Sequence, residues 1–225
     1  MPQFSVIIPA LNEAGQLTEC IASVYNAAKT EVEIIVADGG SQDHTVQVAR
    51  SFASQVFQAE RGRGQQCNAG ATEAAGEILL FLHADSRLPE NAFDVLTREF
   101  RNSEVRIGTF RLSFEPSHWI LRCYEPFSMF DSVFTRFGDQ CITIRKTFFA
   151  RLGGFPNWPL FEDVGLLQIA RRHTKVYSFP TRVTTSSRRY FKNGLIRQQL
   201  KNLWLMLQYL NGVPPEKLAE RYYRR

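Results

Sequence analysis

Four acidic residues occupy positions where they could bind a metal ion or move a proton. Asp38 and Asp85 each follow an apolar run, and Glu162 and Asp163 stand together at the start of a segment with helical spacing. Burying an unpaired carboxylate is costly, so each of these acids needs a cation, donors or solvent. Mg²⁺ and Mn²⁺ are typically held by one or two carboxylates together with substrate phosphate oxygens. A carboxylate beside a second acid is a candidate general base.

Each of these acids also has a simpler interpretation. The segment 38–45, taken alone, is a well-formed strand-to-helix turn in which glycines permit the tight turn and Ser41 or Asp43 caps the helix. An acid pair such as Glu162 and Asp163 in a first helical turn often only offsets the helix dipole. The combination of Asp38, Asp85 and the pair at 162–163 favours a shared polar site, whereas no one of them would do so alone.

The acids are positioned by an alternation of strands and helices in the first half of the chain. Periodicity predicts strands at 4–9, 32–38, 55–58 and 77–85. It predicts helices at 17–28, from 43 onward, at 62–76 and from 89 to 101. This order implies right-handed crossovers and a mostly parallel α/β sheet flanked by helices. Ligands bind outside the carboxyl ends of such strands, where Asp38 and Asp85 are expected.

The second half is less regular. Strands are predicted at 107–115 and 141–145, helices at 161–173 and 189–210, and either a helix or irregular packing at 119–134. The last helix is interrupted by Arg197 and Lys201, so it is not expected to span a membrane. It is either a packing helix, the commoner outcome, or an interfacial amphipathic one. We expect one domain over 1–225, with a nucleotide-binding half (1–100), an acceptor-facing half (101–188) and C-terminal helices (189–225).

Composition places the chain among ordinary globular proteins. Its 225 residues are 44% hydrophobic and 22% charged, enough to bury a substantial core. The N-terminus lacks a basic region and a cleavage site, so we expect no secretory signal. Cys20, Cys67, Cys123 and Cys141 are scattered without metal-ligand spacing, which favours reduced thiols. A cytoplasmic protein is expected.

The positive charge is concentrated in one segment. The net charge is +5, and residues 164–215 contain nine basic residues and no Asp or Glu, so the rest of the chain is slightly acidic. Such a segment attracts the phosphates of a nucleotide, a lipid head group or an anionic membrane surface. A solvated basic face without a partner is the alternative. We find no nucleic-acid-binding motif, so we expect no nucleic-acid partner.

Four segments, in this order and spacing, resemble the family 2 glycosyltransferases of the GT-A fold. They are the opening strand and nucleotide loop at 4–13, the second motif at 36–45, the end of the Asp-x-Asp metal motif at 84–85 and the Glu-Asp acceptor motif at 161–163. The resemblance extends over nearly the whole chain. It implies a GT-A-like, Rossmann-type domain with a C-terminal helical extension. It also implies a hexosyltransferase that moves a sugar from a UDP- or GDP-sugar to an acceptor hydroxyl.

The same resemblance implies roles for individual residues. Asp85 is expected to hold a divalent cation, Mn²⁺ or Mg²⁺, and Asp163, beside Glu162, to deprotonate the acceptor, so that a single displacement inverts the sugar. The residues expected at the nucleotide sugar are Pro9, Ala10, Asn12, Glu13, Asp38, Gly39, Arg61, Arg63, Gln66, Asn68, His83, Ala84, Asp139 and Gln140.

Two residues depart from the family pattern. Gly39 stands where the second motif often has a second Asp, and His83 replaces the first acid of Asp-x-Asp. His83 has three open interpretations: a ribose contact, a Mn²⁺ ligand, or a space-filling side chain. The Gln-x-x-Arg-Trp signature of processive synthases is missing, so a small, soluble, non-processive enzyme is expected.

Two other functions compete with glycosyl transfer. A nucleotidyltransferase would be expected to carry a glycine-rich loop with Arg and Lys after the first strand, whereas this chain has Ala10 to Gly15 there. A catalytically weak nucleotide-sugar-binding or interaction protein is suggested by Gly39 and His83. The basic segment also raises the hypothesis of a lipid-linked acceptor, with peripheral contact between 164–215 and an anionic membrane.

Overall fold

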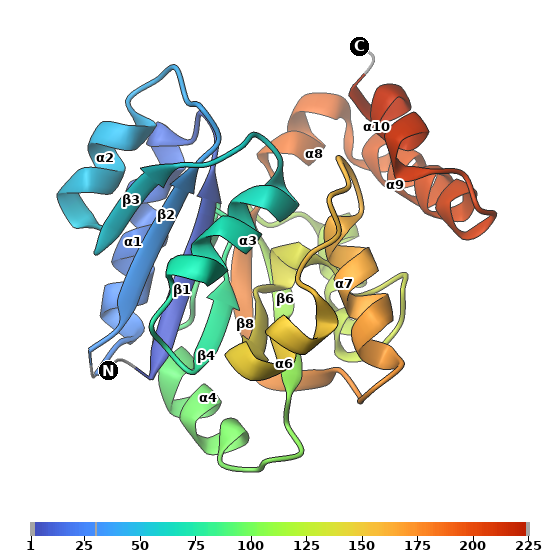
Figure 1. Cartoon of the computed structure of the whole chain (residues 1–225). Helices are drawn as coiled ribbons and strands as arrows, with labels where there is room; N and C mark the ends of the chain where they lie inside the picture. The colour runs from blue at the N-terminus through green and yellow to red at the C-terminus, as the bar shows by residue number, and fades with distance from the viewer. Residues whose placement is uncertain (1–2, 30, 224–225) are drawn as a thin grey trace.

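One mixed sheet runs through both halves of the chain. The computed structural model describes residues 3–29 and 31–223; residues 1–2, 30 and 224–225 belong to the predicted domain but lie outside the described residues. The sheet has eight strands in the order β3-β2-β1-β4-β7-β6-β8-β5, with helices on both faces (Figure 1). Among the described residues, four of the seven strand pairings are parallel and three are antiparallel.

The first half has the predicted alternation of strands and helices. Its strands are β1 (Phe4–Ala10), β2 (Glu33–Asp38), β3 (Gln55–Gln58) and β4 (Ile78–Phe81). All three pairings among them are parallel. The helices that connect or follow them are α1 (Ala14–Ala27), α2 (Thr45–Phe52), α3 (Arg63–Glu73) and α4 (Ala92–Phe100). The carboxyl ends of these strands therefore lie at one edge of the sheet, as the alternation predicts.

The second half introduces the antiparallel pairings. Its strands are β6 (Ile107–Glu115), β7 (Ile142–Arg145) and β8 (Tyr177–Ser186), and β8 also pairs with the short β5 (Ser86–Arg87) of the first half. β7 runs antiparallel to both β4 and β6, while β8 runs parallel to β6. The remaining elements are α5 (Trp119–Tyr124), the 3-10 helices η1 (Glu125–Met129) and η2 (Gly138–Gln140), α6 (Lys146–Leu152), α7 (Glu162–Arg171), α8 (Arg188–Asn193), α9 (Leu195–Leu210) and α10 (Pro215–Tyr223).

Three predictions about these elements need correction. The strand predicted at 77–85 ends at Phe81, so Asp85 lies in a loop beyond the strand. The helix predicted at 189–210 is broken at Gly194, whose φ of 85° is accessible to glycine and strained for other residues. β8 was not predicted, because Pro180 and its neighbouring polar residues conceal the strand pattern.

Two hydrophobic clusters cover the two faces of the sheet. Alternate residues of one strand point to opposite sides, so Val6 and Ile8 join one cluster and Ile7 joins the other. The first cluster packs against α1 and α4 and the second against α3, α6 and α7. The helices α8, α9 and α10 stand to one side of these layers (Figure 1). Within the described residues, no helix combines the length and apolar character needed to cross a membrane.

Candidate functional site

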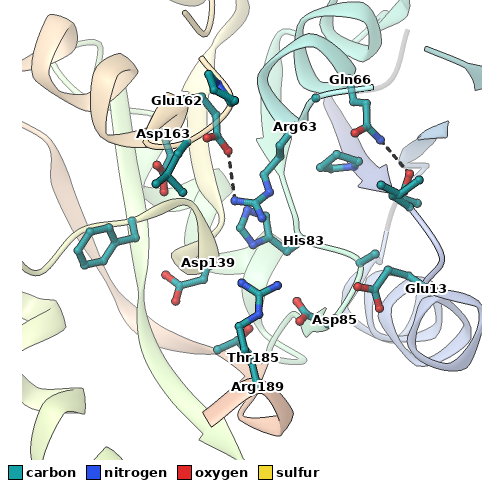
Figure 2. A pocket seen from close by; sticks show the side chains of 18 of the residues that line it. Glu13, Arg63, Gln66, His83, Asp85, Asp139, Glu162, Asp163, Thr185 and Arg189 are labelled. Carbon is teal, nitrogen blue, oxygen red and sulfur yellow. Dashed lines mark hydrogen bonds and ion pairs between the residues drawn. The ribbon is translucent and has the colours of Figure 1, made fainter. Parts of the chain in front are cut away.

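A cavity of about 770 Å³ opens at the carboxyl edge of the parallel strands. Residues from the β1 loop, the start of α3, the β4–β5 loop, η2, the start of α7 and the C-terminal helices line it. Twelve residues predicted from the sequence are among them: Pro9, Ala10, Glu13, Arg61, Arg63, Gln66, His83, Ala84, Asp85, Asp139, Glu162 and Asp163. Figure 2 shows charged side chains from these separate segments pointing toward one space.

Asp163 is held by two backbone amides. The N–H of Gly138 donates to its Oδ2 at 2.5 Å, and the N–H of Val164 donates to its Oδ1 at 2.8 Å. Gly138 is needed for this approach, because a Cβ there would lie 3.0 Å from Nε2 of His83 and 3.1 Å from Oδ2 of Asp163. The carboxylate still has acceptor capacity directed at the cavity, since each oxygen carries two lone pairs.

Glu162 faces a different partner from Asp163. Its Oε1 lies 3.1 Å from Nη1 of Arg63, and its side chain is nearly fully buried. Burial raises the pKa of Glu162, and the Arg63 cation opposes that rise. The pair is charge-assisted and fixes the direction of the guanidinium at the cavity wall. Glu162 therefore orients Arg63, whereas Asp163 contacts backbone amides and keeps acceptor capacity toward the cavity.

Asp139 is a third carboxyl group in the cavity wall. Burial, with smaller contributions from the charges of Asp163 and Asp85, raises its pKa to about 7. Its Oδ1 is buried and has no hydrogen-bond partner within the part of the chain that the structure describes. Both protonation states are therefore accessible near neutral pH, so Asp139 can either donate or accept a hydrogen bond.

The loop that carries Asp139 is anchored from behind by buried polar side chains. Nη1 of Arg136, which is 1% exposed, donates to Oγ1 of Thr109 at 2.6 Å and to the carbonyl oxygen of Tyr177 at 2.8 Å. Thr109 in turn donates to Oε1 of Gln140 at 3.2 Å. This network ties η2 to β6 and β8, and it fixes the position of Asp139.

His83 lies between the two groups of acids. Burial is the main reason that its pKa lies well below the ordinary histidine value, and the nearby cations Arg63 and Arg189 lower it further. The imidazole is neutral at pH 7 and keeps a free lone pair on one ring nitrogen. Because His83 lines the cavity, its ring can contact a ligand there. The ribose and metal-ligand interpretations both stay open.

Asp85 shares a basic partner with Glu13. Nη2 of Arg188 lies 3.7 Å from Oδ2 of Asp85 and also contacts Oε2 of Glu13. Among the described residues, no group of three or more acidic, histidine or cysteine side chains could cage a metal. One carboxylate is nonetheless the usual protein contribution where substrate phosphates complete the coordination of Mg²⁺. The donor set therefore fits a cation shared with a phosphate ligand.

The sequence profile of glycosyl transferase family 2 matches residues 5–158, which include β1 to β4 and most of the cavity wall. This chain belongs to glycosyl transferase family 2.

Curated relatives of this family 2 chain are named as glycosyltransferases. A PGL/p-HBAD biosynthesis glycosyltransferase of Mycobacterium tuberculosis is 36% identical over 96 residues, covering 40% of this chain and 38% of the relative. The 4,4'-diaponeurosporenoate glycosyltransferase of Staphylococcus haemolyticus is 30% identical over 145 residues, covering 60% of this chain and 38% of the relative. The chain thus spans about two fifths of the length of these relatives.

Solved structures share the fold of the chain at low sequence identity. S. aureus TarS 1-349 in complex with UDP-GlcNAc has a TM-score of 0.69 and 21% identity, covering 83% of this chain and 59% of TarS 1-349. The mannosyltransferase PcManGT from Pyrobaculum calidifontis, in complex with GDP-Man and Mn²⁺, has a TM-score of 0.68 and 18% identity, covering 97% and 68%. The GT-A fold expected from the motifs is confirmed.

Asp38 and Gly39 of the second family motif lie outside the large cavity. Asp38 borders a smaller cavity of about 310 Å³, where its Oδ2 accepts from the N–H groups of Gly40 and Ser41, both at 2.9 Å. Its Oδ1 is buried and without a hydrogen-bond partner among the described residues. Gly39 permits the close approach of Gln66, since a Cβ would lie 3.0 Å from Oε1 of that side chain. Oδ1 of Asp38 thus keeps an unused acceptor position, which is closed to solvent in this structure.

Gln66 acts mainly as a clamp between strands. Its Nε2 donates to the carbonyl oxygens of Ala10, at 2.8 Å, and Ala37, at 2.7 Å. The ends of β1 and β2 are therefore held together behind the cavity. Gln66 thus supports the loop that follows β1, and both N–H groups of its side-chain amide donate to backbone carbonyl oxygens.

Besides Asp38 and Gly39, three more predicted contact residues do not line the large cavity. Asn68 exchanges two 2.9 Å hydrogen bonds with the backbone of Phe155, one in each direction. Gln140, the last residue of η2, is fully buried, and Oδ1 of Asn12 accepts from the N–H of Gln42 at 2.8 Å. The amides of Asn68 and Gln140 brace the walls in this structure and Asn12 braces the β1 loop, so direct contact of these residues with a donor stays a prediction.

The C-terminal quarter contributes cavity residues that the motifs did not predict. These are Thr185, Ser186, Arg189, Tyr190, Gln198, Asn202 and Tyr222. The basic segment 164–215 was a signal for Arg189, which points into the cavity beside His83 and Asp139 (Figure 2). Gln198 and Asn202 of α9 carried no such signal, because a Gln and an Asn four residues apart are common on the polar face of any helix.

Proposed function

We propose that this chain transfers a sugar from a nucleotide-sugar donor to an acceptor hydroxyl. The single observation that carries the proposal is the cavity that gathers Asp163, Asp139, Asp85 and three arginines, Arg61, Arg63 and Arg189, at the carboxyl edge of the sheet. Membership of family 2 and the fold shared with enzymes solved with UDP-GlcNAc and GDP-Man support it.

The donor would lie along the β1 loop with its diphosphate toward the arginines. The unpartnered Oδ1 of Asp38 is an acceptor suited to an N–H of a nucleobase, which both uracil and guanine offer. Arg63 and Arg189 face the cavity and would neutralise the diphosphate. Since this recognition element suits both bases, a UDP-sugar and a GDP-sugar remain the two donor candidates.

A divalent cation, Mn²⁺ or Mg²⁺, would be held by Asp85, with Glu13 and the neutral His83 nearby. When bound, such a cation stabilises the negative charge that develops on the leaving diphosphate. Arg188 pairs with Asp85 and Glu13 in the structure, so it would have to move or share these oxygens with the cation.

The transfer step itself would be carried by Asp163. Its carboxylate, fixed by the amides of Gly138 and Val164, accepts the proton of the acceptor hydroxyl. The hydroxyl oxygen forms the new bond to the anomeric carbon as the bond to the diphosphate oxygen breaks, and the diphosphate leaves with the electron pair. One displacement of this kind inverts the configuration. Arg63, oriented by Glu162, stabilises the departing charge.

The test compares Asp163→Asn with the exposed acid variant Asp94→Asn, whose carboxylate pairs with Lys29 far from the cavity. Loss of a general base lowers kcat by roughly 10²- to 10⁴-fold, whereas donor affinity should change little. Donor turnover would be measured with UDP- and GDP-sugars in the presence of Mn²⁺, and donor binding by calorimetry. Full activity of Asp163→Asn would exclude its role as base. Donor binding without turnover by the wild type on any donor would favour the interaction-protein alternative.

A further inference from the structure

The outward face of α9 is entirely apolar. Six side chains, each 43–63% exposed, form what we call the α9 stripe: Ile196, Leu200, Leu203, Trp204, Leu207 and Leu210. At about 100° per residue they fall within roughly a third of the helix circumference. The residues of α9 that face the protein include the buried Gln198, Leu205 and Met206. The helix is therefore more apolar toward solvent than a packing helix should be.

Isolated exposed apolar residues are normal, but a continuous row of them indicates a binding surface. α9 has 16 residues, so the stripe extends over roughly 24 Å. On the preceding helix α8, Phe191 is also exposed, and its ring lies 6.1 Å from that of His118. His118 in turn contacts Trp119, which is 69% exposed. The surface thus combines aliphatic side chains with tryptophan and phenylalanine, as interfacial helices do.

Charge distinguishes between the candidate partners of this surface. The segment 164–215, which contains the whole stripe, has nine basic residues and no acidic ones. Arg197 of α9 and Lys192 of α8 are exposed, and the guanidinium of Arg221 lies 5.9 Å from the ring of Trp204. On α10 the exposed Glu216 and Glu220 are matched in number by Lys217 and Arg221, so the excess charge of this region is positive. A second copy would bring the same positive charge to the contact. An anionic lipid surface complements both the apolar row and the charge.

The opposite side of these same helices lines the cavity. Gln198 and Asn202 of α9, with Arg189 and Tyr190 of α8, belong to the cavity wall. In Figure 1 both helices lie at the same end of the molecule, beside α7. A surface that covers the α9 stripe would therefore lie one helix diameter, roughly 10 Å, from the cavity.

We propose that the α9 stripe docks this chain on an anionic bilayer, with the stripe at the boundary between head groups and acyl chains. The acceptor is then a hydroxyl-bearing lipid that reaches the cavity from the membrane. The docking proposal depends only on the apolar stripe and the basic residues around it. The proposed class of acceptor also rests on the proposed transferase function.

Vesicle co-sedimentation of the whole chain tests the docking. The probes are vesicles of phosphatidylcholine alone and vesicles that also contain phosphatidylglycerol, at low and high salt. We expect binding to the anionic vesicles, weakened by salt. The double variant Leu203→Gln/Leu207→Gln should lower the binding constant by roughly tenfold or more, because two leucines no longer leave water. The matched control is Phe52→Gln on α2, a residue exposed to a similar extent on a different face.

Three outcomes would overturn the proposal. The first is the absence of binding to anionic vesicles at low salt, and the second is equal binding by wild type and the stripe variant. The third is a wild-type dimer that the stripe substitutions dissociate, without vesicle binding, since this would assign the stripe to a contact between copies. Two further measurements separate the membrane-docking proposal from the glycosyltransferase proposal. In calorimetry with UDP and GDP, the stripe variant should bind nucleotide as the wild type does. In co-sedimentation, Asp163→Asn should bind vesicles as the wild type does.

Discussion

The carboxyl group of Asp139 shows how the fold changes the chemistry of a single residue. An exposed aspartate is ionised at neutral pH, whereas burial and the negative charges of Asp163 and Asp85 raise the pKa of Asp139 to about 7. Arg63 is the cation that opposes this shift. The native state therefore binds a proton between pH 4 and pH 7 that the unfolded chain, with an ordinary pKa near 3.9, has released.

This difference predicts a pH-dependent loss of stability. Because the native state binds more protons in that window, the free energy of unfolding falls as pH rises from about 4 to about 7, and the loss is complete above pH 7. The side chain at this position cannot ionise in the variant Asp139→Asn. The difference in melting temperature, variant minus wild type, should therefore be larger at pH 8 than at pH 5.

The measurement is thermal unfolding of both proteins at the two pH values. Asp94→Asn, at an exposed position, should show no such change. The same difference between Asp139→Asn and wild type at both pH values would mean that Asp139 ionises normally in the folded protein.

Gly138 makes the contact between two elements, η2 and α7, that positions the predicted base Asp163. Its amide donates to Asp163, and the space beside its Cα is filled by His83 and Asp163. Gly138→Ala should displace this carboxylate by a few tenths of an ångström. A displacement of about 1 Å costs about 10²-fold in rate, so roughly a tenfold fall in kcat is expected.

The control for Gly138→Ala is Gly15→Ala in α1, where an added Cβ would meet nothing within 4 Å. That substitution should leave kcat unchanged and stabilise the helix by about 0.5–1 kcal/mol. Equal kcat values for wild type and Gly138→Ala would show that the η2 contact does not position Asp163.

The parallel half of the sheet was predictable from the sequence for a physical reason. The strands β1, β2 and β4 are buried on both faces, so each is a continuous apolar run. β8 was not predictable in this way, since it pairs β6 on one side and the two-residue β5 on the other and carries Pro180 and several polar residues. Its place depends on partners that are distant in sequence.

The whole molecule should become more stable when its cavity is filled. A nucleotide that binds only the native state at 100 times its Kd stabilises it by about 2.7 kcal/mol. For a domain of this size, each kcal/mol raises Tm by roughly 2–4 °C. We expect a shift with UDP or GDP in the presence of Mn²⁺ that is smaller after metal removal with EDTA.

The variant Asp85→Asn gives this prediction its control. If Asp85 holds the cation, the nucleotide should raise the Tm of the variant by the same amount with and without EDTA. That increase should equal the increase that the nucleotide causes in the wild type when metal has been removed. An EDTA effect of equal size in both proteins would place the metal on other groups.

The sequence alone determined the family, the parallel α/β half and the identity of the acids, because motif order and apolar runs are local properties of the chain. Tertiary structure decided how these residues are used. It paired Glu162 with Arg63, raised the pKa of Asp139, engaged the amides of Asn68 and Gln140 in hydrogen bonds, and brought Arg188 to Asp85. Each of these outcomes depends on distance and burial between segments that lie far apart in the sequence, and no local pattern specifies them.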